Sequence, residues 1–217
     1  MKKSRMPLSN RGGFGKRPIP SNERLTRYCR YRPIRKECAL LVIDMQDFFL
    51  DKSSHACISN PSAVEGNVRS VLNSFREAEI PVFFTKHVHH EREDLGAMGR
   101  WWRDPLMASS PMSELRIEPI EGEKIIHKSS YDAFYGTDLE RWLRGMGVEE
   151  IVLIGVMTHL CVETTARSAF VRDLDVTVVG DATGSSYEKL HINSLTVMAH
   201  GLAVIKNTID VIREVSP

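Results

Sequence analysis

Short, continuous runs of apolar residues alternate along the chain with longer segments in which apolar residues recur at helical spacing. Ala39 to Met45 (ALLVIDM) is one such run, and runs of this kind are typical of parallel strands that are buried on both faces. Pro61 to Ala78 has an apolar residue at every third or fourth position, which predicts an amphipathic helix. The alternation predicts a three-layer α/β/α fold around a central, mostly parallel six-stranded sheet.

The pattern extends over most of the chain. The predicted strands cover Ala39 to Met45, Pro81 to Thr85, Lys124 to His127, Ile151 to Val156, Val176 to Val179 and Ala203 to Ile205. The predicted helices cover Pro61 to Ala78, Thr137 to Met146, Thr158 to Arg172 with Thr158 as its N-cap, Tyr187 to His200 and Thr208 to Glu214. Between them, His87 to Glu123 has no clear period, and a segment of that length is usually a lid or a pocket wall.

Composition narrows the class of protein. The chain has 217 residues, 42% of them hydrophobic and 26% charged, which indicates one soluble globular domain and excludes a disordered, collagen-like or coiled-coil protein. The sequence has no apolar stretch of about 18 residues, so no membrane span is predicted. The four cysteines lack C-x-x-C spacing, so neither a disulfide scaffold nor a zinc site of paired thiolates is expected. A reducing, cytoplasmic location follows.

Charge is distributed unevenly. Met1 to Lys36 holds twelve lysines and arginines but a single acid, Glu23, whereas the rest of the chain has 17 basic and 27 acidic residues. We therefore divide the chain into a basic N-terminal extension, 1–36, and a folded domain, 37–217. The extension is either a nucleic-acid-binding tail or a segment that lies on an acidic surface of its own or a neighbouring subunit. We expect the second: a homo-oligomer, dimer or tetramer, whose interface orders the extension, with no nucleic acid or membrane partner.

Three reactive residues fall where strands of the predicted sheet end. Asp44 closes the first strand, Lys128 follows the third, and Cys161 lies in the first turn of the helix after the fourth. Open parallel sheets bind ligands at the carboxyl ends of their strands, so all three should meet at one edge. An ammonium and a helix N-terminus lower a thiol's pKa, and a carboxylate can move the thiol's proton. The trio predicts a cysteine nucleophile with an acid–base partner.

Longer motifs surround these residues, and they resemble the isochorismatase-like cysteine hydrolase superfamily, which includes nicotinamidases and N-carbamoylsarcosine amidohydrolases. The resemblance runs from Ala39 to Ile212, and its most specific stretch surrounds Cys161. The matching segments are LLVIDMQDFF, PVFFTKHVH, HKSSYDAFYGTDLERWLR, IVLIGVMTHLCVETTARSAFVRD and GDAT. The segment before Glu37 has no counterpart in that family.

The resemblance implies a role for each matching residue. Asp44 would be the general base, Lys128 its electrostatic partner, and Cys161 the nucleophile that forms an acyl-enzyme. The Val156–Met157 peptide bond would be cis, and the backbone N–H groups of Met157 and Cys161 would form the oxyanion hole. The expected substrate is a small molecule, and no cofactor is expected.

Substrate contacts are less well defined. Phe49 matches an aromatic position of the family, while Gln46 and Phe134 are either pocket residues or parts of the scaffold. Trp101 and Trp102 could stack on a substrate ring or simply cover the core. One of four arginines in or near the long segment could bind a substrate carboxylate; these are Arg92, Arg100, Arg103 and Arg116.

The sequence departs from the metal site of nicotinamidases. That site begins with D-x-H, and the aligned residues here are His87 and His89, without the aspartate. His87, His89 and His90 could still bind a metal, but we expect none. His159 lies two residues from Cys161, a spacing that does not bring helical side chains together, so a papain-like pair is not expected.

The predicted function is therefore the hydrolysis of a C–N amide or ureido bond in a small molecule. Two alternatives stay within the family: cleavage of an isochorismate-like substrate, and nicotinamide hydrolysis. The cysteine argues against the first, although GRWWRDPL resembles a segment of the isochorismatase branch. A third alternative is a catalytically silent scaffold with a nucleic-acid-binding tail, which the presence of Asp44, Lys128 and Cys161 argues against.

Overall fold

The computed structural model describes residues 31–91, 94–102 and 104–216. Their six strands form one sheet in the order β3-β2-β1-β4-β5-β6, and every neighbouring pair is parallel. The strands are β1 (Cys38–Ile43), β2 (Val82–His87), β3 (Lys124–Lys128), β4 (Glu150–Val156), β5 (Asp175–Gly184) and β6 (Val204–Lys206). No helix among the described residues is both long and apolar enough to cross a membrane.

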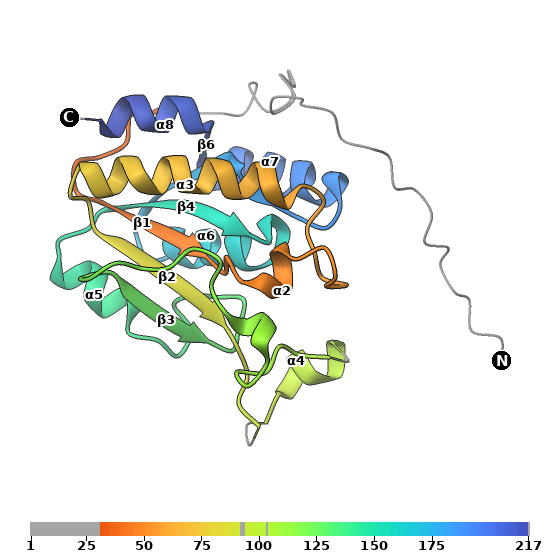
Figure 1. Cartoon of the computed structure of the whole chain (residues 1–217). Helices are drawn as coiled ribbons and strands as arrows, with labels where there is room; N and C mark the ends of the chain where they lie inside the picture. The colour runs from red at the N-terminus through yellow and green to blue at the C-terminus, as the bar shows by residue number, and fades with distance from the viewer. Residues whose placement is uncertain (1–30, 92–93, 103, 217) are drawn as a thin grey trace.

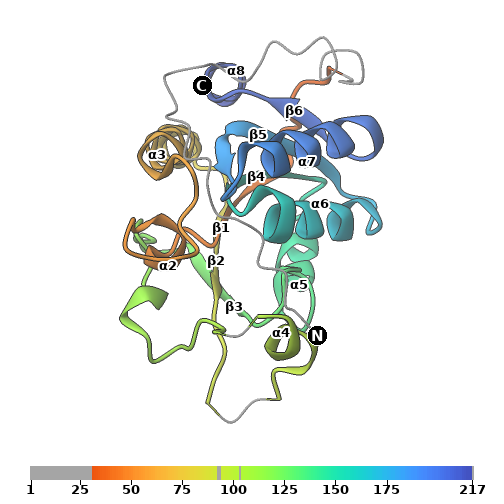
Figure 2. The ribbon, with the colours of Figure 1, turned by 90° about the vertical axis from the view of Figure 1, so that its right-hand side faces the viewer.

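Helices cover both faces of the sheet, which confirms the predicted three-layer architecture (Figures 1 and 2). One face carries α2 (Asp47–Leu50), α3 (Pro61–Glu77) and α8 (Thr208–Val215). The other carries α5 (Leu139–Gly145), α6 (Glu163–Phe170) and α7 (Glu188–Gly201). Side chains alternate along each strand, so β1 sends Leu40 and Val42 to the first face and Leu41 and Ile43 to the second.

Several predicted boundaries were wrong. The long segment after β2 contains α4 (Gly96–Trp101) and a 3-10 turn (Pro111–Ser113), and α2 was also missed, because helices of a few residues are too short to show a period. β5 continues beyond its predicted end at Val179 through GDAT. It does so by bulging, since the pairing with β4 shifts between Leu153 and Gly155.

Residues 31–35 lie on the acidic body of the same chain. The Arg32 guanidinium donates to both carboxylate oxygens of Glu150, at 2.8 and 3.2 Å, and the Arg35 backbone N–H donates to the same group at 2.8 Å. Tyr31 and the backbone N–H of Ile34 bind Glu214. Residues 31–35 therefore pack against the folded domain. Residues 1–30 lie outside the described part of the chain, and their ordering by a partner subunit stays a prediction.

Arg32→Ala should destabilise the fold. Glu150 is fully buried at the start of β4, and removal of its partner leaves a buried carboxylate with fewer donors. We expect a loss of about 2–3 kcal/mol in the free energy of unfolding, seen as a fall of about 5–10 °C in Tm by calorimetry. Arg35→Ala is the matched control, because its exposed side chain pairs with Glu149 and Asp175 and should contribute less than about 1 kcal/mol. Equal Tm values for the two variants would contradict the assignment.

Candidate active site

The candidate site lies at the carboxyl edge of the sheet, where the strand order reverses. Asp44 follows β1 directly, and Lys128 is the last residue of β3 rather than the residue after it. Cys161 lies in a π-helical turn, Thr158–Val162, that follows β4. β1 sits between β2 and β4, which makes its end the topological switch point where open α/β sheets bind ligands.

The three predicted residues are in contact. Lys128 Nζ lies 2.7 Å from Asp44 Oδ2 and 3.3 Å from Cys161 Sγ, and it also donates to the backbone oxygen of Ser130 at 3.0 Å. The side chains of Asp44 and Lys128 are completely buried, and Cys161 is 5% exposed. A thiol, a carboxylate and an ammonium thus share one small buried space.

Thr85 orients the carboxylate. Its hydroxyl donates to Asp44 Oδ1 at 2.5 Å and accepts from the Asp44 backbone N–H at 3.1 Å. Asp44 has a φ of +47°, a conformation rare outside glycine that aspartate tolerates better than most residues. The sequence analysis missed Thr85. The available signal was a polar residue on β2, in the FFTK run that ends at the same edge.

Two strands approach each other closely just before the turn that carries Cys161. Gly155 has a φ of +107°, and a Cβ there would lie 2.1 Å from the backbone oxygen of Ile43, so no other residue fits this position of β4. The Val156–Met157 peptide bond is cis, as the resemblance implies. The turn that carries Cys161 then begins at Thr158.

Helix α7 packs against this turn. The Thr158 hydroxyl pairs with His191 Nδ1 at 2.8 Å, so Thr158 does not act as the predicted N-cap. Ser194 Oγ lies 3.1 Å from the Thr158 backbone oxygen and 2.6 Å from Glu163 Oε2. Sequence reasoning could not have found His191 and Ser194, because they lie about 30 residues further along the chain and only packing brings them here.

Burial and charge set the protonation of the trio. Burial raises the pKa of the Cys161 thiol, the Lys128 ammonium lowers it and the Asp44 carboxylate raises it, which leaves the pKa above its ordinary value. Burial alone would raise the pKa of Asp44, but Lys128, with smaller contributions from His87 and Cys161, brings it below its ordinary value. Burial lowers the pKa of Lys128, but Asp44 and Cys161 together more than compensate and leave that pKa above its ordinary value. The resting site therefore holds a thiol, a carboxylate and an ammonium.

This protonation corrects the prediction of a thiol with a lowered pKa. The ammonium acts as expected, but burial outweighs it. The Asp44 carboxylate lies within 4.8 Å of the Cys161 sulfur, which places an acceptor for the thiol's proton close by when the sulfur attacks. In this arrangement the thiol can lose its proton to the carboxylate as it attacks, while the Lys128 ammonium stays in place beside both groups. His159 takes no part in this pair, since its Nδ1 pairs with Ser185 Oγ at 2.9 Å.

Comparison with known proteins identifies the family. The model of the isochorismatase domain matches residues 38–210. The chain belongs to the isochorismatase family. It is 36% identical to Nicotinamidase 3 of Arabidopsis thaliana over 178 residues, which are 80% of this chain and 86% of that protein.

Solved structures of the family share the fold. A cysteine hydrolase from Pseudomonas syringae pv. phaseolicola 1448A has a TM-score of 0.80 at 26% identity, over 86% of this chain and 96% of that one. N-carbamoylsarcosine amidase from Thermoplasma acidophilum has a TM-score of 0.68 at 28% identity, over 79% and 96% of the two chains.

The residues present do not fit the metal site of the family's nicotinamidases. His87, which replaces the aspartate, lies with Nδ1 3.4 Å from Lys128 Nζ. In the described part of the chain, the one group of three donors within 4.8 Å of one another is Asp44, His87 and Cys161. The Lys128 ammonium contacts all three. A cation thus already sits among them, and His87, His89 and His90 form no such group in the described residues.

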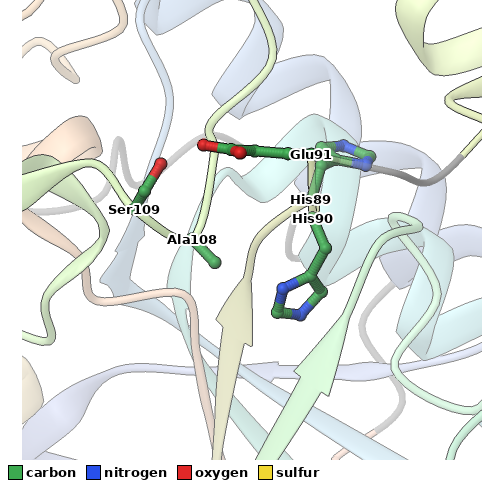
Figure 3. A pocket seen from close by; sticks show the side chains of 5 residues that line it. All are labelled: His89, His90, Glu91, Ala108 and Ser109. Carbon is green, nitrogen blue, oxygen red and sulfur yellow. The ribbon is translucent and has the colours of Figure 1, made fainter.

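The described residues line two hollows. One, of about 450 Å³, lies between α4, the segment after β3 and the turn that carries Cys161; its lining residues are Ala97, Met98, Trp101, Trp102, Tyr131, His159 and Leu160. Leu160 adjoins Cys161, and Trp102 Nε1 donates to the Tyr131 hydroxyl at 2.5 Å. The other, of about 270 Å³, lies beyond β2 and is lined by His89, His90, Glu91, Ala108 and Ser109 (Figure 3).

The remaining substrate-contact candidates have mixed positions. The amide of Gln46 is fully buried and bound to the backbone of His87 and Ser113, which is the scaffold role that the sequence left open. Phe49 and Phe134 are buried in the two halves of the core. Trp101, by contrast, is 78% exposed. Of the arginines, Arg116 pairs with Asp47, and Arg92 and Arg103 lie outside the described residues.

Two substitutions should shift the reactivity of Cys161 in opposite directions. Lys128→Met removes the charge that lowers the thiol's pKa, so the pH midpoint of alkylation should rise by about one unit or more. Asp44→Asn removes the charge that raises it and leaves the thiolate as the counter-ion of Lys128, so the midpoint should fall. Iodoacetamide labelling of the Cys161 peptide, measured by mass spectrometry against pH, tests both. Midpoints that do not separate would remove these charges from the control of the thiol.

Proposed function

We propose that the protein is a cysteine hydrolase that cleaves a C–N amide or ureido bond of a small molecule through an acyl-enzyme on Cys161. The observation that carries this proposal is the contact of Lys128 Nζ with both Asp44 Oδ2 and Cys161 Sγ in one buried space. A thiol beside a carboxylate suits covalent catalysis, because one group attacks while the other takes the proton.

The proposed reaction has two halves. The Cys161 sulfur attacks the carbonyl carbon as its proton passes to Asp44, and Asp44 then delivers that proton to the departing nitrogen. Cleavage of the C–N bond releases ammonia or an amine and leaves a thioester on Cys161. A water molecule gives a proton to the Asp44 carboxylate as it attacks the thioester. The C–S bond then breaks, the acid is released, and Asp44 returns that proton to the Cys161 sulfur.

Lys128 and the turn after β4 serve both halves in this proposal. The ammonium stabilises negative charge on sulfur as it develops, and it keeps the Asp44 carboxylate ready to accept a proton. The backbone N–H groups of Met157 and Cys161 are proposed as donors to the oxyanion of the tetrahedral intermediate. Both follow a strand whose position is set by the close approach of Gly155 to β1.

We propose a small acyclic amide or ureido acid as the preferred substrate. An ion that would bind a ring nitrogen or polarise the carbonyl needs a strong donor set, and His87 contributes no negative charge where the nicotinamidases have an aspartate. The hollow beside Leu160 is the proposed site for the acyl portion, with Trp101 and Trp102 in its wall.

Nicotinamide is the second candidate, and two observations favour it. One is the 36% identity with a protein named Nicotinamidase 3. The other is the aromatic lining of the hollow by Trp101, Trp102 and Tyr131, which suits a flat ring. Cleavage of an isochorismate-like substrate stays an alternative, although a cysteine nucleophile is not required to break an enol ether.

Cys161→Ala should abolish turnover and leave Tm within a few degrees of the parent protein. Its side chain is small and buried, so loss of the sulfur removes the nucleophile with little loss of packing. Ammonia release from a panel of primary amides and ureido acids measures turnover. Cys57→Ser is the matched control, because Cys57 is a partly exposed cysteine outside the Asp44, Lys128 and Cys161 group, and it should keep full activity. Substantial activity in the alanine variant would refute the acyl-enzyme.

Activity should survive a strong chelator. We expect carbamoyl and maleamic acids to have a higher kcat/KM than nicotinamide after dialysis against the chelator. Added zinc, iron or manganese should give no gain. The competing outcome is a chelator-sensitive enzyme that a metal restores and that prefers nicotinamide, which would make this chain a nicotinamidase with His87 as a ligand. Hydrolysis of isochorismate alone would favour the remaining alternative.

A further inference from the structure

The ammonium of Lys128 has more acceptors than protons. An ammonium donates three hydrogen bonds, and four acceptors surround Nζ. Asp44 Oδ2 at 2.7 Å and the Ser130 oxygen at 3.0 Å take the two short bonds. Cys161 Sγ at 3.3 Å and His87 Nδ1 at 3.4 Å lie at longer and nearly equal distances. The third proton is therefore shared between the sulfur and the imidazole.

The ammonium also determines the state of His87. Because an ammonium can only donate, Nδ1 must offer a lone pair, and a neutral ring then carries its proton on Nε2. Burial lowers the pKa of His87 to about 4, with a further contribution from the Lys128 charge. His87 is thus a neutral acceptor, whereas an aspartate at this position would be an anion.

The fold holds the imidazole firmly in this place. His87 and Lys128 are direct partners in the β2–β3 register, so their side chains leave the sheet side by side. Gln46 Oε1 accepts from the His87 backbone N–H at 2.8 Å, and Gln46 Nε2 donates to the His87 backbone oxygen at 3.1 Å. The His87 ring meets the His89 ring edge to face, at a centroid distance of 5.1 Å.

We propose that His87 is a positioning residue for Lys128, a neutral acceptor that keeps the third ammonium proton poised between Nδ1 and Cys161 Sγ. In the resting site the thiol is a weak acceptor, so the imidazole holds the proton and fixes the position of Nζ. When negative charge develops on sulfur, the same proton turns toward it over a short path. The inference rests on the proposed cysteine hydrolase function, but its first test needs no substrate.

Neutrality is the essential property of this acceptor. A second carboxylate beside Asp44 would draw the ammonium away from sulfur and repel the developing thiolate. Asparagine has the shape of aspartate without its charge, and its amide oxygen can take the place of Nδ1. Leucine fills a similar volume with no acceptor. These three substitutions separate charge, hydrogen bonding and packing at one position.

The first test is the pH dependence of iodoacetamide alkylation at Cys161 in His87→Asn and His87→Asp. The two side chains are isosteric, so a difference between them reports charge. We expect the His87→Asp midpoint to lie about one pH unit above that of His87→Asn, which should stay near the parent value. Equal midpoints in two folded variants would overturn the proposal. Because labelling requires no turnover, this result is independent of the substrate and of the proposed function.

The second test is turnover of the best substrate from the amide panel. His87→Leu should lower kcat about tenfold with KM little changed, since a displaced ammonium weakens the reaction step more than binding. His87→Asn should restore kcat to within about threefold of the parent. Equal kcat values for the Leu and Asn variants would overturn the positioning role. Absence of turnover in the parent protein would instead count against the proposed function, and the labelling result would still stand for His87.

Discussion

A completely buried ion pair, Lys128 with Asp44, is the constraint around which the candidate site is built. Taking either ion out of water costs several kcal/mol, and removal of one partner from such a pair typically costs about 3–5 kcal/mol. The pair is tolerable because its other atoms are satisfied. Thr85 binds the second carboxylate oxygen, and the Ser130 carbonyl binds the ammonium. The same two charges set the protonation of the thiol that lies against them.

Strand order explains which other residues surround the pair. β1 and β3 are separated by β2, so Asp44 and Lys128 start about 10 Å apart, two strand spacings across the sheet. The long lysine side chain therefore crosses the end of β2 to reach the carboxylate. β2 supplies the two groups that the lysine side chain passes: Thr85 lies on the carboxylate side and His87 lies beside the ammonium. On the far side of β1, the β4 turn brings Cys161 to the same point.

The family context makes the position of His87 informative. Relatives with the same fold carry names of nicotinamidases, carbamoylsarcosine amidases and cysteine hydrolases. In this chain, the position that the nicotinamidase motif gives to an aspartate carries a neutral imidazole turned toward the lysine. The space where donors converge is occupied by an ammonium, which supplies fixed positive charge from the protein itself. The His87 side chain thus connects β2 to the ammonium that contacts Cys161.

Local sequence determined the layers of this protein and the three residues that meet at the candidate site. Apolar runs such as Ala39 to Met45 are readable because a strand buried on both faces needs every residue apolar. Asp44, Lys128 and Cys161 were found because the carboxyl ends of parallel strands share one edge. The motifs around Cys161 then identified the family, and the structure and comparisons confirm the fold.

Only the tertiary structure decided how these groups interact. The thiol's pKa depends on burial, which no local pattern measures, so the prediction of a lowered value was wrong. The contact of His87 with Lys128 depends on the β2–β3 register, and the hold of His191 and Ser194 on Thr158 depends on the packing of α7. These are contacts between residues about 30 or more positions apart, and distance along the chain carries no information about them until the sheet has closed.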